Sequence, residues 1–218
     1  MHQRRNGGLL AGVERRVLIA IAGRLPACIT PDHLTTLAIL AMAGAALSLL
    51  ASPDGPAGVW AFAGCLALNW FGDSLDGTLA RVRHIERPRY GYYVDHVIDL
   101  MGVALLLVGF AASRYMSAFV ALSLLAAYAM ISAETFLSTH VRGVFHLSFA
   151  GVGPTELRVL LAVGVMVERA RPWVEVAGRR LRFFDVGGAI AAALLAAAFL
   201  IRAVRNGRAL YVAEPAPR

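Results

Sequence analysis

Residues 73–99 read DSLDGTLARVRHIERPRYGYYVDHVID and connect two apolar runs, AGVWAFAGCLALNWFG (57–72) and LMGVALLLVGFAAS (100–113). Acidic residues lie where each run meets this connection: Asp73, Asp76, Asp95 and Asp99. A charge at bilayer depth costs about 2.5–3.5 kcal/mol even on the lenient insertion scale. Neighbouring carboxylates also repel one another, so a cation has to offset them. The stretch therefore predicts an acidic, cation-binding site between two membrane helices.

The composition supports a membrane protein. Of the 218 residues, 58% are apolar and 16% are charged, whereas soluble domains have about 45–50% and 25%. These values exclude an ordinary soluble enzyme and a disordered chain. The formal charge is +7, and every basic residue is an arginine. In so apolar a chain, this charge indicates contact with anionic lipid headgroups and not with nucleic acid.

Six segments are long and apolar enough for membrane helices, which need about 20 residues. They are residues 33–52, 57–82, 91–113, 116–139, 154–169 and 185–204. The sequence SPDGP at 52–56 predicts a tight turn that joins the first two spans. Upstream, residues 9–25 place apolar side chains at helical spacing among arginines. This pattern predicts an N-terminal amphipathic helix in the membrane interface, with a short buried helix as the alternative.

The expected class is therefore an all-α integral membrane protein with six transmembrane helices after an interfacial helix. We divide the chain into a cytoplasmic N-terminus with that helix (1–30), a membrane domain (31–205) and a cytoplasmic tail (206–218). With both termini inside, most loop arginines are cytoplasmic, as the positive-inside rule requires. Residues 168–184 are the exception, and their sequence predicts a small hairpin. We expect a bacterial inner-membrane protein whose active site faces the cytoplasm.

Helical periodicity brings the aspartates together. At 100° per residue, Asp73, Asp76, Gly77, Ala80 and Arg81 fall within an arc of about 140°. Gly91, Asp95 and Asp99 share one stripe at i, i+4 and i+8. The short connection makes the two helices antiparallel neighbours, so all four carboxylates are expected in one pocket. Oxygen ligands favour Mg²⁺ or Mn²⁺, and several carboxylates can hold two ions.

The same residues resemble a known motif. The string D-x2-D-G-x2-A-R followed by G-x3-D-x3-D resembles the motif of the CDP-alcohol phosphotransferases, the membrane enzymes of phospholipid head-group synthesis. All eight positions match: Asp73, Asp76, Gly77, Ala80, Arg81, Gly91, Asp95 and Asp99. The gap between Arg81 and Gly91 is about one residue longer than the resemblance leads us to expect. The sequence TPDHLTT at 30–36 also resembles the TPN-x-LT of this family, with Asp32 in place of Asn.

The resemblance implies a metal-dependent transfer of a substituted phosphate from a CDP-linked donor to an alcohol, with release of CMP. By position, Asp73, Asp76, Asp95 and Asp99 would bind two Mg²⁺ or Mn²⁺ ions, and Asp99 would also be the general base. The residues implied at the CDP site are Asp76, Gly77, Ala80, Arg81 and Gly91. A homodimer is implied as well, with membrane lipids as partners and no further cofactor.

The acceptor site is the least determined part. Glu134 lies within the apolar run AAYAMISAETFLSTH (126–140), and an ionisable residue in a span is a functional candidate, although a buried pair with an arginine would also explain it. Glu156 has an ordinary explanation as a carboxylate in the first turn of a helix. We expect an acceptor site formed by Glu134, His140, Arg142 and Glu156. A Glu in span four followed by GPTE resembles the amino-alcohol branch, which uses CDP-choline or CDP-ethanolamine. CDP-diacylglycerol with a polar acceptor is the alternative.

Two other functions compete with this interpretation. A UbiA-type prenyltransferase also binds magnesium through aspartates on facing helices, but it needs about nine spans and has no use for Gly77, Ala80 and Arg81. A divalent-cation transporter would carry its acidic residues near mid-membrane on several spans. Here the acidic residues gather at one side, beside an arginine suited to phosphate.

Overall fold

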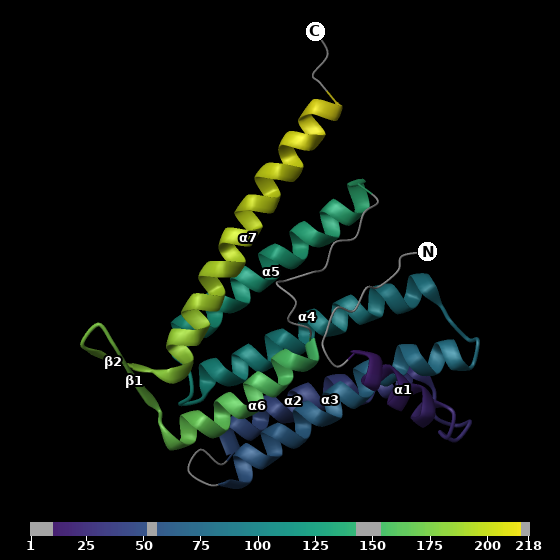
Figure 1. Cartoon of the computed structure of the whole chain (residues 1–218), viewed down its shortest axis with the longest axis horizontal. Helices are drawn as coiled ribbons and strands as arrows, with labels where there is room; N and C mark the ends of the chain where they lie inside the picture. Colours follow the sequence, from purple (N-terminus) through teal and green to yellow (C-terminus); the bar gives the residue numbers. More distant parts are fainter. Residues whose placement is uncertain (1–10, 52–55, 143–153, 215–218) are drawn as a thin grey trace.

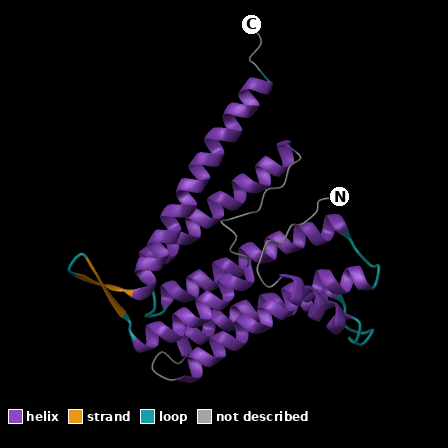
Figure 2. Ribbon diagram, viewed as in Figure 1, coloured by secondary structure: helices purple, strands orange, loops and turns teal. Residues whose placement is uncertain are grey.

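The computed structural model describes residues 11–51, 56–142 and 154–214, and in them the chain forms helices and one short hairpin (Figure 1; Figure 2). The elements are α1 (Ala11–Ala22), α2 (Pro31–Ala51), α3 (Pro56–Val82), α4 (Pro88–Ala112), α5 (Ala118–Arg142), α6 (Pro154–Ala170), β1 (Trp173–Val176), β2 (Arg179–Arg182) and α7 (Phe183–Ala213). The all-α class and the small hairpin are confirmed. The turn expected at 52–56 falls on residues outside the described ranges, apart from Pro56.

Helix α2 is the centre of the packing, because it lies against both α3 and α4. Helix α3 also contacts α1 and α6, and α4 contacts α5. In Figure 1, α5 and α7 run side by side and diverge from the other helices. A core of buried side chains joins α2, α3, α4 and α7, with Phe110 between Phe62 and Phe184 at ring-centroid distances of 6.0 and 4.9 Å.

Four of these helices are long and apolar enough to cross a membrane: α2, α4, α5 and α7. Helix α3 has 27 residues but contains Asn69, Asp73 and Asp76, which lower its mean hydropathy. Helix α6 has 17 residues, which is short for a span. Each of the six expected segments thus corresponds to a helix. Only four of these helices in the described residues are both long and apolar enough to cross a membrane. Helix α7 continues to Ala213, beyond the expected end of its span at 204.

Helix α1 is fixed to the helix that carries the first aspartates. Its buried residues Leu18 and Ala22 join a cluster with Leu34, Leu75 and Leu79 of α2 and α3. Arg15 and Arg16 are exposed. Glu14 Oε1 accepts hydrogen bonds from Trp70 Nε1 at 2.8 Å and from Thr155 Oγ1 of α6 at 3.3 Å. Helix α1 therefore packs on the protein through Leu18 and Ala22, while its apolar residues Val17 and Ile19 are exposed. Glu14 links α1, α3 and α6.

Small residues allow the close contact of α2 with α4. A Cβ added at Gly109 would lie 2.8 Å from both Cα and Cβ of Ala46, closer than carbon atoms can pack. We expect Gly109→Ala to lower the free energy of unfolding by about 1–3 kcal/mol through overpacking. Gly64→Ala is the matched control, because a Cβ there meets nothing within 4 Å. Thermal unfolding in detergent measures both, and equal midpoints for the two variants would contradict this account of the α2–α4 contact.

Candidate metal and substrate site

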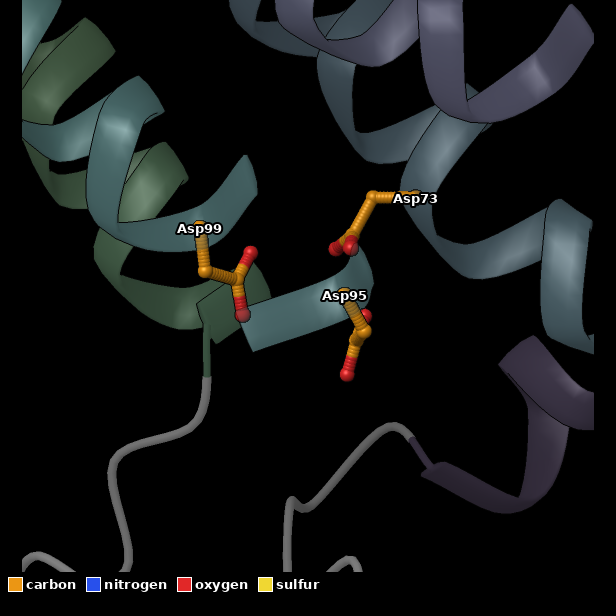
Figure 3. A group of neighbouring side chains, drawn as sticks. All are labelled: Asp73, Asp95 and Asp99. Carbon is orange, nitrogen blue, oxygen red and sulfur yellow. The ribbon is translucent and has the colours of Figure 1, made fainter. Parts of the chain in front are cut away.

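Three of the four aspartates come together where the end of α3 meets the start of α4. Asp73, Asp95 and Asp99 each offer a carboxylate oxygen, and these atoms lie within 4.8 Å of one another (Figure 3). Asp73 and Asp95 are half-buried and Asp99 is exposed. The i, i+4 spacing places Asp95 and Asp99 on one face of α4, opposite Asp73. These closely spaced oxygen donors fit a hard divalent cation.

Asp76 is held differently from the other three. Its carboxylate accepts a hydrogen bond from Thr35 Oγ1 of α2 at 2.7 Å and one from its neighbour Gly77 N at 2.5 Å. The charges of Asp73 and Asp95 still act on it, so it belongs to the same acidic region. Three of the four expected carboxylates thus converge. The fourth, Asp76 of α3, lies beside them and is hydrogen-bonded to α2. Thr35 is a threonine of the TPDHLTT stretch, to which the sequence analysis gave no role.

Arg158 of α6 was not expected at this site. Its Nη2 donates to Asp73 Oδ2 at 2.6 Å, and its Nε donates to Asn69 Oδ1 at 2.7 Å. Asn69 Nδ2 in turn donates to the backbone oxygen of Ala38 in α2 at 3.0 Å. This chain of hydrogen bonds fixes the Asp73 side chain between three helices. The guanidinium also offsets part of the repulsion among the carboxylates.

The residues implied at the CDP site lie next to the acidic group. Arg81 is exposed, and its Nη2 donates to Thr78 Oγ1 at 3.2 Å. A Cβ on Gly77 would lie 3.3 Å from Arg81 Nη1, so the glycine leaves space for this guanidinium. Ala80 is half-buried, and a Cβ on Gly91 would meet nothing within 4 Å. Arg81 and Gly91 are thus exposed, and Ala80 is partly covered.

Helix α5 packs on α4, the helix that carries Asp95 and Asp99. The ring of His96 packs on Tyr92 and on Phe136 of α5, with centroids 4.2 and 5.3 Å apart. The charge of Asp99 acts on Tyr128 of α5, which shares a hydrogen bond with Ser132. The sequence does not indicate Tyr128, since a tyrosine in an apolar run has no distinctive pattern.

The residues expected at the acceptor site are spread over two helices. Glu134 is 8% exposed, and its Oε1 accepts a hydrogen bond from Asn206 Nδ2 of α7 at 2.5 Å. Its Oε2 is buried without a hydrogen-bond partner among the described residues. His140 is exposed at the end of α5, and Glu156 is half-buried in the first turn of α6. Arg142 ends α5, and its side chain lies outside the described part of the chain.

Comparisons with known proteins identify the family. Residues 28–204 match the CDP-alcohol phosphatidyltransferase family, so the chain belongs to it. The family and the four long apolar helices make the chain an integral membrane transferase of phospholipid biosynthesis. The fold is similar to the crystal structure of phosphatidylinositol phosphate synthase from Mycobacterium tuberculosis with CDP-DAG bound. The TM-score is 0.59 at 22% identity, covering 90% of this chain and 94% of that chain. No curated protein matches the sequence.

Proposed function

We propose that this protein transfers a substituted phosphate from a CDP-linked donor to an alcohol hydroxyl and releases CMP. The observation that carries the proposal is the convergence of Asp73, Asp95 and Asp99, three residues of the family motif, within 4.8 Å. The acceptor oxygen would attack the phosphorus distal to cytidine. The bond from that phosphorus to the bridging oxygen would break, and CMP would leave with the bridging oxygen.

We propose that Asp73, Asp76, Asp95 and Asp99 hold two divalent ions, Mg²⁺ or Mn²⁺. Such ions supply positive charge that stabilises the attacking and leaving oxygens of a phosphoryl displacement. Asp73 would be kept in position by Arg158, and Asp76 by Thr35. Both contacts leave carboxylate oxygens with further lone pairs for coordination.

Asp99 would be the general base. It is the exposed member of the three, so an acceptor hydroxyl can reach it, and it would take the proton as the new phosphorus–oxygen bond forms. Arg81 offers a planar donor fork suited to the donor's phosphates. Gly77, Ala80 and Gly91 would leave room for the nucleotide, and the half-buried Asp76 would border it.

The proposal is tested by CMP release from purified protein in lipid nanodiscs. CDP-diacylglycerol, CDP-choline and CDP-ethanolamine are each offered with a panel of alcohols that includes inositol, glycerol phosphate, serine and diacylglycerol. The lipid product is identified by its mass. We expect one donor–acceptor pair to release CMP with Mg²⁺ or Mn²⁺ and not with EDTA. Prenyl transfer or ion flux without CMP release from any pair would favour the competing functions.

The buried carboxylate of Glu134 supports a role in acceptor binding, because one of its oxygens has no partner among the described residues. We propose an acceptor site with Glu134, His140, Arg142 and Glu156. Glu134→Gln and His140→Ala should raise the KM for the acceptor while the KM for the donor changes little. Glu214→Gln is the control, since Glu214 is exposed at the end of α7. Unchanged acceptor kinetics in both site variants would remove this assignment.

We also propose that the site faces the cytoplasm, as the distribution of loop arginines indicates, and that the protein is a homodimer, as the family resemblance implies. In a Cys28→Ser background, a cysteine at Glu86 in the α3–α4 loop should react with impermeant reagents from the cytoplasmic side only. A cysteine at Glu175 in the hairpin should react from the opposite side. Labelling of Glu86→Cys from outside would contradict the proposed topology. A monomeric mass in mild detergent would contradict the proposed dimer.

A further inference from the structure

The β1–β2 hairpin lies at the end of the molecule opposite the acidic site. Helix α6 begins at the site, where Thr155 and Arg158 contact Glu14 and Asp73. Its 17 residues rise about 25 Å before the hairpin begins. In Figure 2 the two strands project from one side of the molecule, and in Figure 1 helix α1 lies toward the other. The hairpin is therefore remote from the proposed chemistry.

The hairpin has a defined geometry. Trp173 pairs with Arg182 at its base, and Val176 pairs with Arg179 beside the turn. Both turn residues have positive φ, 51° at Ala177 and 77° at Gly178, as a two-residue type I′ turn requires. At the base, Phe183 N donates to Pro172 O at 3.0 Å, and Arg182 Nη1 donates to Arg114 O at 2.9 Å. These bonds fix the strands to the ends of α4 and α7.

Apolar side chains of the hairpin are left uncovered. Trp173, Val176 and Leu181 are 49%, 44% and 40% exposed. A two-stranded hairpin is marginally stable in water without an apolar partner. Helix α7, a candidate span, begins at Phe183 directly after β2, so the hairpin sits where the chain enters the bilayer. Trp60, near the start of α3 and 66% exposed, adds a second tryptophan of the kind found at membrane interfaces.

The hairpin region carries an excess of positive charge. The side chains of Arg171, Arg179 and Arg180 are exposed and make no hydrogen bond or ion pair with the described residues. Glu175 is the one acidic residue of the hairpin and lies opposite Arg180 in the ladder, so it offsets at most one of the three charges. Glu168 is 4% exposed and interacts with Arg114 and Arg182, and Asp185 Oδ1 accepts a hydrogen bond from Ser117 N at 2.6 Å. With the active site on the cytoplasmic side, as proposed above, these arginines lie on the outer side, where the positive-inside rule predicts few of them. A negative partner outside the chain would account for them.

We propose that the β1–β2 hairpin lies in the headgroup layer of the leaflet opposite the active site and binds anionic phospholipids there. The guanidinium groups of Arg171, Arg179 and Arg180 contact lipid phosphates, to which their donor geometry is suited. Trp173, on one face of the ribbon, contacts the outer part of the acyl chains, as do Val176 and Leu181 on the other face. This surface is distinct from the substrate site and does not depend on the transferase activity.

The test uses the full-length protein in vesicles of phosphatidylcholine with a minor share of phosphatidylglycerol. Either lipid carries brominated acyl chains, which quench tryptophan fluorescence at short range. The signal of Trp173 is the difference between the wild-type protein and Trp173→Phe. We expect brominated phosphatidylglycerol to be enriched about fivefold over brominated phosphatidylcholine around Trp173, the factor that one arginine supplies at an anionic surface. No quenching by either lipid would place the hairpin in water and overturn the proposal.

Two variants separate the role of these arginines from a general surface effect. The triple variant Arg171→Gln, Arg179→Gln, Arg180→Gln should lose the preference for the anionic lipid and retain CMP release, because these side chains are exposed and remote from the aspartates. The double variant Arg205→Gln, Arg208→Gln changes exposed arginines of α7 and should retain the preference. A preference that survives in the triple variant contradicts the proposal. So does its abolition by inorganic phosphate at constant ionic strength, which would indicate a site for free phosphate.

Discussion

Asp95→Asn and Asp99→Asn are expected to abolish CMP release while a folded protein remains in the membrane. Asparagine keeps the size of the side chain but removes the charge that binds a hard cation. Loss of the base at Asp99 alone lowers turnover about 10²–10⁴-fold, and loss of a metal ligand adds to this. Asp73→Asn and Asp76→Asn should be inactive for the same reason. Radiolabelled CMP release in nanodiscs measures all four variants.

The variants should differ in two further measurements. Asp99→Asn should retain donor binding better than Asp73→Asn, because a base acts on the acceptor. In thermal unfolding, Mg²⁺ should stabilise the wild-type protein and stabilise each variant less. Without metal, Asp95→Asn and Asp99→Asn should unfold no earlier than wild type, since one of the repelling charges is gone. Glu86→Gln removes an exposed carboxylate of the nearby α3–α4 loop and should behave as wild type. Near-full activity in any of the four variants would show that its aspartate is not a ligand.

The sequence predicted that Asp73, Asp95 and Asp99 lie close together. Asp95 and Asp99 share a face through their spacing on one helix. Asp73 lies near them, although α3 and α4 both pack mainly on α2 and are not the close neighbours that the short connection predicted. The helix positions were also predictable to within a few residues at most ends, since long apolar runs with proline and glycine at their ends leave few alternatives. The sequence predicted membrane crossing less strongly for α3 and α6. Helix α3 contains polar residues, and α6 is short.

Contacts between distant segments could not be predicted in this way. Asp76 is bonded to Thr35, 41 residues earlier in the chain, and nothing in either stretch indicates the other as a partner. Glu134 illustrates the same limit. A buried arginine is the partner that the sequence suggests for it, but the structure places Asn206 there, and Arg202 bonds to the adjacent Thr135. Helical spacing predicts which face of a helix is polar. Tertiary packing decides which residue of another helix contacts that face.

Among the contacts that the sequence did not indicate, the one between Arg158 and Asp73 has the largest expected effect on activity. It is the positively charged partner of Asp73, and both side chains are largely shielded, with 16% and 24% exposed. Groups that orient a metal ligand change metal affinity or activity about 10–100-fold when they are replaced. We expect Arg158→Gln to lower turnover by this factor and to raise the Mg²⁺ concentration needed for half of the thermal stabilisation.

Arg158→Lys separates orientation from charge. Lysine keeps the positive charge, but its single ammonium group cannot reproduce the fixed fork that reaches Asn69 and Asp73 together. If Arg158 positions Asp73, the lysine variant stays impaired in both turnover and Mg²⁺ response; recovery in Arg158→Lys would reduce the role of Arg158 to charge compensation. Arg208→Gln, which removes an exposed arginine of α7, is the matched control. Tighter Mg²⁺ binding in Arg158→Gln would contradict the positioning role, because it would mean that the guanidinium competes with the ion for Asp73.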